Sequence, residues 1–189
     1  MTNKDRENIL SKYNMLSSWM LWDDNLPKDK INWEKVKTNC VFVALNPSDE
    51  APGKWLSFHK SGSKGDANLR AAFEGSKYEG CYVTDLIKYK DLECHEVFKT
   101  AKSNLVKIEM AKNPQIYKRN VDALKEELGC FDEDLTIFVF GENAYNMIAY
   151  NPDISCAYKV VRISHFSPPS KYAMTSKEYI SQIKKELKI

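Results

Sequence analysis

The chain has 189 residues, of which 43% are hydrophobic and 29% charged, and its net charge is +2. This length and composition predict one globular domain with a buried core, whereas the small net charge permits nucleic-acid binding without arguing for it. No apolar stretch is long enough to cross a membrane, and the N-terminus is polar. We therefore expect a cytoplasmic protein that has no membrane partner.

Strands and helices are predicted to alternate along the chain because short β-branched runs are separated by stretches with helical spacing of apolar residues. The alternation favours a three-layer α/β/α fold with a four-stranded, mostly parallel central sheet, in one domain over 1–189 whose residues 1–35 form a helical extension. The expected elements are a helix over 3–22, a strand over 39–47, a long loop over 48–66, a helix over 67–75 capped by Asp66, a strand over 81–87, one or two helices over 100–112 and 115–128, a strand over 135–141, a helix over 142–150, a strand over 157–164 and a helix over 176–187.

The five cysteines are scattered and form no CxxC pair. This spacing gives no support to a zinc or iron–sulfur site, and reduced thiols beside apolar strands are the expected state. No Walker loop, GxGxxG turn or GxSxG elbow follows a strand. We therefore expect no metal and no cofactor.

Polar residues lie at the ends of three of the four predicted strands. Asn46 and Ser48 mark the end of the first strand, Asp85 lies near the end of the second, and Ser164 and His165 mark the end of the last. In open α/β sheets, ligands bind outside the carboxyl ends of the strands. The candidate site is therefore expected at that edge.

Two of these strand ends carry recognisable motifs, "ALNPS" (44–48) and "HFSP" (165–168), with "YVTDLIKYK" (82–90) and "FVFGENAYNMI" (138–148) between them. Their order and spacing resemble the uracil-DNA glycosylase superfamily, and within it an uncharacterised glycosylase-like bacterial branch. The resemblance implies a monomeric enzyme that binds DNA, flips a damaged or modified base and hydrolyses its N-glycosidic bond to leave an abasic site.

The resemblance also implies roles for single residues. Asn46 would position the attacking water and His165 would donate a hydrogen bond to the leaving base. Base contacts would come from Phe58, Asp85 and Ser48, with Trp55 as the alternative to Phe58 for stacking. The DNA backbone would be held by Ser167 and Pro168, together with the loop lysines Lys60 and Lys64.

The motifs depart from the family at four positions. Ala44 replaces a glycine, and Ser48 stands where strict uracil enzymes have a bulky tyrosine. Phe166 replaces a proline and is either a wedge or a core residue. Asp85 replaces the asparagine that reads uracil. An ionised carboxylate only accepts hydrogen bonds, so we expect a modified or amino-bearing base rather than uracil.

A purely structural role is also open for Asp85. A helix cap or a salt bridge to Lys88 or Lys90 is as well expected as contact with a base. A second hypothesis is a glycosylase-fold protein that binds nucleic acid or a nucleotide without cleaving it. A third is a nucleoside or nucleotide N-glycosidase, for which Asp49 and Glu142 are the nearby carboxylates.

Overall fold

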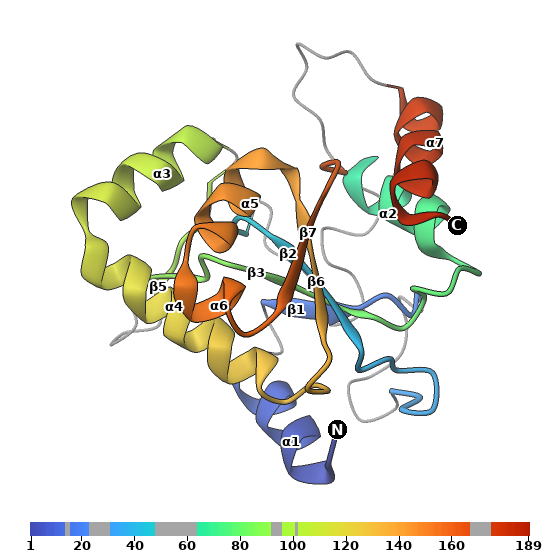
Figure 1. The fold of residues 1–189 in the computed structure, drawn as a ribbon, viewed down its shortest axis with the longest axis horizontal. Helices are drawn as coiled ribbons and strands as arrows, with labels where there is room; N and C mark the ends of the chain where they lie inside the picture. The colour runs from blue at the N-terminus through green and yellow to red at the C-terminus, as the bar shows by residue number, and fades with distance from the viewer. Residues whose placement is uncertain (14–15, 23–30, 48–63, 92–95, 101, 167–174) are drawn as a thin grey trace.

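The computed structural model describes residues 1–13, 16–22, 31–47, 64–91, 96–100, 102–166 and 175–189. Within these residues a five-stranded sheet lies between helices on both faces (Figure 1). The strands of this sheet are β1 (Ser17–Trp19), β2 (Cys40–Ala44), β3 (Tyr82–Asp85), β6 (Thr136–Phe140) and β7 (Lys159–Ile163), and β4 (Tyr89–Asp91) pairs with β5 (Glu96–Val97) in a separate ribbon. The helices are α1 (Asn3–Lys12), α2 (Lys64–Phe73), α3 (Ser103–Lys112), α4 (Pro114–Leu128), α5 (Gly141–Ala149), α6 (Pro152–Ser155) and α7 (Ser176–Leu187).

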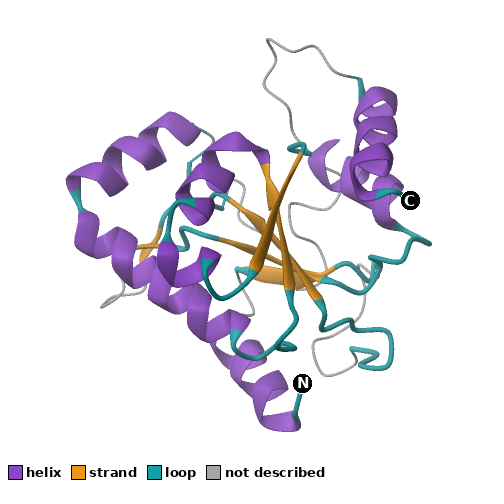
Figure 2. Cartoon of the chain, viewed as in Figure 1, coloured by secondary structure: helices purple, strands orange, loops and turns teal. Residues whose placement is uncertain are grey.

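The sheet has the strand order β1-β3-β2-β6-β7. All neighbours are parallel except β1, which runs antiparallel to β3 along one edge. Figure 2 shows the strands crossing the middle of the molecule with helices around them. The predicted mostly parallel sheet is thus confirmed, and each of the four predicted strands is present. The predicted number of strands is wrong, because the sheet has five.

The fifth strand comes from the segment 3–22, which was predicted to be one helix. The helix α1 ends at Lys12, and all three residues of β1 are buried. A short run of apolar residues does not distinguish a helix from a buried strand. As part of this strand, Trp19 is fully buried in the core, where the centroid of its ring lies 4.7 Å from that of Tyr82.

Two hydrophobic cores lie on opposite faces of the sheet. In β2, Val41 and Val43 point into one core, and Phe42 and Ala44 into the other. This alternation is that of a strand buried on both faces. The first core is covered by α1, α3, α4, α5 and α6, and the second by α2 and α7. The three predicted layers are therefore present.

The helices agree with prediction except at a few boundaries. α7 spans the expected 176–187, and the region 100–128 forms two helices, with Gly129 after the second. α2 begins earlier than expected, so Asp66 lies in its first turn instead of capping it. The short α6 and the β4–β5 ribbon were not predicted. No helix in the described ranges has the length and apolar character required to traverse a bilayer.

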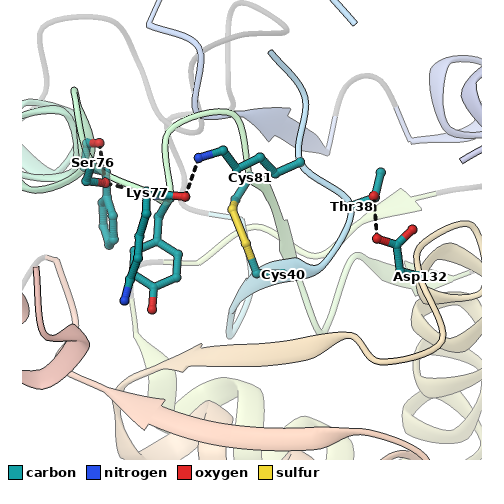
Figure 3. Close-up of a disulfide and its surroundings, with 9 residues drawn as sticks. Thr38, Cys40, Ser76, Lys77, Cys81 and Asp132 are labelled. Atoms are coloured by element: carbon teal, nitrogen blue, oxygen red, sulfur yellow. Dashed lines mark hydrogen bonds between the residues drawn. A yellow bond between two sulfur atoms is a disulfide. The ribbon is translucent and has the colours of Figure 1, made fainter. Parts of the chain in front are cut away.

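The structure joins Cys40 and Cys81 in a disulfide (Figure 3). The expected reduced state of these two thiols is therefore wrong. The reason is register: Val41 pairs with Tyr82, so the residues one step earlier face each other at the start of two parallel strands. Their Cα atoms are 6.0 Å apart, which suits a disulfide. Among the other described cysteines, Cys130 is a buried free thiol and Cys156 an exposed one.

Candidate functional site

One row of buried side chains crosses the carboxyl edge of the parallel strands. Asp85 on β3 is in register with Ala44 on β2, and Phe140 on β6 is in register with Ile163 on β7. The two pairs meet because Val43 and Val139 are partners one residue earlier. Ala44, Phe140 and Ile163 all belong to the core beneath α2 and α7. The row is therefore an apolar floor with one carboxyl group at its β3 end.

Asn46 lies just past the end of β2 and is held in one orientation. Its Nδ2 donates to the carbonyl oxygens of Pro47 at 2.7 Å and Thr100 at 2.8 Å. The peptide N–H of Thr100 donates back to the Pro47 carbonyl at 3.2 Å. Because both amide hydrogens are engaged, Oδ1 is the group of Asn46 that remains to accept a hydrogen bond. This arrangement suits a side chain that positions water.

His165 is held by aromatic packing and by a glycine. Its ring stacks on that of Phe166, with centroids 4.4 Å apart, and Phe166 packs edge-on against Phe140 at 4.9 Å. Gly141 begins α5 with φ +78°, and a Cβ added there would lie 3.3 Å from Cβ of His165. Gly141 thus leaves the space that His165 occupies.

Phe166 is fully buried, so of its two predicted roles the core one is confirmed. Its carbonyl oxygen accepts a hydrogen bond from Nδ2 of the buried Asn68 on α2 at 3.0 Å. This bond ties the segment that carries His165 to the helix facing it. Sequence reasoning missed Asn68 as a positioning residue. A signal was present, because its polar side chain falls beside Leu69 and Ala72 on the buried stripe of α2.

Asp85 has neither of the two structural roles predicted for it, a helix cap or a salt bridge to Lys88 or Lys90. It ends a strand instead of capping a helix, and Lys90 pairs with Glu96. Lys88 donates to the backbone carbonyl of Asp85, not to its carboxyl group. The side chain is 4% exposed, and Oδ1 has no hydrogen-bond partner. Burial raises the pKa of this carboxyl to about 8, with Lys88 lowering it and Glu127 raising it further.

A buried ion pair supports the end of β3 from the opposite face. Lys88 Nζ lies 2.7 Å from Oε2 of Glu127 on α4, and neither side chain is exposed. Oε1 of Glu127 accepts hydrogen bonds from the hydroxyls of Thr84, at 2.8 Å, and Tyr82. Desolvation by burial and the nearby Glu127 charge raise the pKa of Tyr82.

Asn120 completes this support. Its Oδ1 accepts from the peptide N–H groups of Lys88 and Tyr89, and its Nδ2 donates to the carbonyl of Tyr89. Sequence reasoning missed both Asn120 and Glu127. They were detectable in the pattern of α4, because each occupies an apolar-stripe position beside Val121, Leu124 and Leu128.

The remaining predicted site residues divide into two groups. Lys64 is exposed in the first turn of α2. Ser48, Phe58, Lys60, Ser167 and Pro168 lie outside the described residues, as do Trp55 and Asp49. The structure thus places Asn46, Asp85 and His165 along one edge. Neighbouring strands lie about 4.8 Å apart, which puts the ends of β2 and β7 about 10 Å from each other.

No cluster of three or more metal-binding side chains occurs within the described ranges. No protein-family model matches the chain, and a comparison with curated protein sequences finds no similar protein. The chemistry of the site therefore rests on its own residues.

Proposed function

We propose that the protein is a DNA glycosylase-like enzyme, with a uracil-DNA glycosylase-like fold, that hydrolyses the bond between a flipped base and its sugar. The observation that carries the proposal is the clamped amide of Asn46 at the carboxyl edge of the sheet, with His165 two strands away. The motifs "ALNPS" and "HFSP" that hold these residues support it further.

Cleavage of an N-glycosidic bond develops positive charge on the sugar and negative charge on the departing base. A neutral amide is a poor general base, so Asn46 suits a dissociative reaction in which the base departs before water has fully attacked. Oδ1 of Asn46 would accept a hydrogen bond from that water and direct its oxygen toward C1′. The bonds to Pro47 and Thr100 keep Oδ1 from rotating away.

His165 would act on the other product. A ring N–H donates a hydrogen bond to the oxygen of the base, where negative charge grows as the bond breaks. One preorganised donor of this kind is typically worth about 3–4 kcal/mol in the transition state. Packing of the ring against Phe166 and Gly141 gives that donor a defined direction before the substrate binds.

The test is an excision assay on single- and double-stranded oligonucleotides that carry uracil, hypoxanthine, xanthine or modified cytosines, with abasic sites cleaved by alkali. We expect one of these bases to be released, and Asn46→Ala and His165→Ala each to slow release by about two to three orders of magnitude. Asn8→Ala, on α1, is the matched control and should excise at the wild-type rate.

Wild-type rates in Asn46→Ala and His165→Ala would overturn the assignment. If no base is released but an oligonucleotide binds with an affinity that falls as salt rises, the protein is instead a glycosylase-fold binder. Release from free nucleotides alone would favour the soluble N-glycosidase.

A further inference from the structure

Ser164 lies between the last paired residue of β7 and His165, and it is hydrogen-bonded to α7. Pairing of β7 with β6 ends at Ile163, so the chain beyond it depends on other contacts for its position. The peptide N–H of Ser164 donates to Oε2 of Glu186 at 2.8 Å, and its hydroxyl donates to Oε1 of the same carboxylate at 2.8 Å. Nε2 of Gln182 donates to the Ser164 hydroxyl oxygen at 2.6 Å and to Oε1 of Glu186 at 2.9 Å.

The sequence of α7 explains why these two side chains meet the end of β7. Gln182 and Glu186 are four residues apart, so they lie on the same face of the helix. The buried stripe beside them belongs to the core that also contains Ile163, and it consists of Tyr179, Ile183 and Leu187. Burial of this stripe therefore brings the polar pair of α7 to the residue before His165.

The residue after His165 is held in a similar way from α2. The carbonyl oxygen of Phe166 accepts a hydrogen bond from Nδ2 of Asn68 at 3.0 Å. α2 and α7 pack against each other over the same core, and Figure 1 shows them side by side near the end of β7. The two neighbours of His165 are thus bonded to two helices of one layer, whereas His165 itself is only half-buried.

We infer that Glu186 is a positioning residue for His165, which it holds through Ser164 with the support of Gln182. This inference rests on the proposed function, because it concerns the same histidine. A carboxylate that accepts from both the N–H and the hydroxyl of Ser164 fixes the backbone from which the imidazole projects. A donor contributes to catalysis only when it points to where charge develops. A misplacement of about 1 Å can cost about a hundredfold in rate.

The experiment measures kcat and KM of base excision for wild type, Glu186→Ala, Glu186→Gln and Glu7→Ala. Glu7 is an exposed carboxylate on α1 and controls for the loss of one negative charge. We expect Glu186→Ala to lower kcat about ten- to a hundredfold with little change in KM, because the bond from His165 strengthens as the base departs. Glu186→Gln keeps an amide oxygen that accepts from Ser164, so its kcat should stay within about threefold of wild type.

The His165→Ala background distinguishes action through the histidine from a general loss of structure. If Glu186 acts through His165, Glu186→Ala should not slow release further when His165 is already absent. Urea unfolding identifies the temperature at which every variant is fully folded. An equal loss in both backgrounds, or an equal loss in Glu186→Gln and Glu186→Ala, would overturn the inference and leave the proposed excision intact.

A second measurement does not depend on catalysis. The ring of Phe166, whose centroid lies 4.4 Å from that of His165, shifts the NMR resonances of the imidazole protons. Those resonances are assigned by their absence from His165→Ala and compared at a single pH. We expect Glu186→Ala to move them toward the values of an unstructured histidine, and Glu186→Gln and Glu7→Ala to leave them near those of wild type.

The two measurements fail separately. If wild type excises no base, the proposed function is wrong, and the imidazole resonances still decide whether Glu186 positions His165. Resonances that are unchanged in Glu186→Ala would show that it does not.

Discussion

Lys88 and Glu127 form an ion pair in which Nζ lies 2.7 Å from Oε2 and neither side chain is exposed to solvent. The desolvation of two charges is costly, so such a pair persists only when further polar contacts satisfy it. Here the carbonyl of Asp85 accepts from Lys88, and the hydroxyls of Thr84 and Tyr82 donate to Glu127. The pair joins α4 to the end of β3 and thereby positions the strand end that carries Asp85.

Breaking this pair from either side should be severely destabilising. We expect Lys88→Met and Glu127→Gln each to lower the free energy of unfolding by about 3–5 kcal/mol, because each leaves a buried charge without its partner. The double variant should lose less stability than the sum of the losses in the two single variants. Urea unfolding at pH 7 measures the free energy of unfolding of each variant. Lys118→Met removes one partner of the exposed Lys118–Asp122 pair and should cost less than about 0.5 kcal/mol. Additive losses at Lys88 and Glu127 would contradict the coupling.

The buried acid of Asp85 should make stability depend on pH. Its pKa is about 8 in the folded protein and near the usual value of 3.8 when unfolded, so the folded state holds one more proton between these values. The free energy of unfolding should therefore fall as pH rises through this window, by up to about 1.4 kcal/mol per pH unit, and level off above pH 8.

Asp85→Asn has no proton to lose at this site, so its free energy of unfolding should lack the part of the fall with pH that Asp85 causes in wild type. Urea unfolding of both proteins at several pH values between about 5 and 9 gives the comparison. Relative to wild type, Asp85→Asn should gain stability steadily as pH rises. Equal slopes for the two proteins would show that Asp85 is already ionised when folded.

Alanine substitutions at two glycines distinguish the effect of backbone strain from the effect of displacing His165. Gly141 and Gly75 have similar positive φ angles, +78° and +73°, but only a Cβ at Gly141 meets His165, whereas a Cβ at Gly75 meets nothing within 4 Å. Substitution by alanine should cost roughly 1–2 kcal/mol of backbone energy at each site. Gly141→Ala should in addition slow base release, because the new methyl group displaces the imidazole ring. Thermal unfolding measures the loss of stability of the two variants, and the excision assay measures their rates of base release. Equal rates for the two variants would show that Gly141 does not position His165.

The Cys40–Cys81 disulfide should contribute roughly 2–4 kcal/mol to stability, since it closes a long loop between two strands. Unfolding with and without a reductant measures the difference, and Cys156→Ser, at an exposed free thiol, is the control variant. Alkylation of unfolded, unreduced protein should leave Cys40 and Cys81 unmodified. Disulfides are rare in the reducing cytosol, so the state of this pair in cells also tests the cytoplasmic prediction.

Local patterns were sufficient to predict most of the helices and parallel strands. The run from Cys40 to Leu45 is apolar throughout and is followed by Asn46-Pro47, which favours a buried strand that stops there. The periodicity of α4 and the threonine that caps α7 likewise specify helices without reference to the rest of the chain. The polar residues after these strands could be expected at one edge because parallel strands end together.

The sequence by itself therefore determined the layered α/β architecture and the edge at which Asn46, Asp85 and His165 lie, since hydrophobic periodicity is a local property and the helices between successive strands make those strands run parallel. Strand order, the antiparallel β1, the contact of Gly141 with His165 and the disulfide were decided only by the tertiary structure, because each depends on residues far apart in the chain. The same holds for the protonation of Asp85. A carboxyl group is charged or neutral according to what surrounds it, and only the packed sheet removes this one from water.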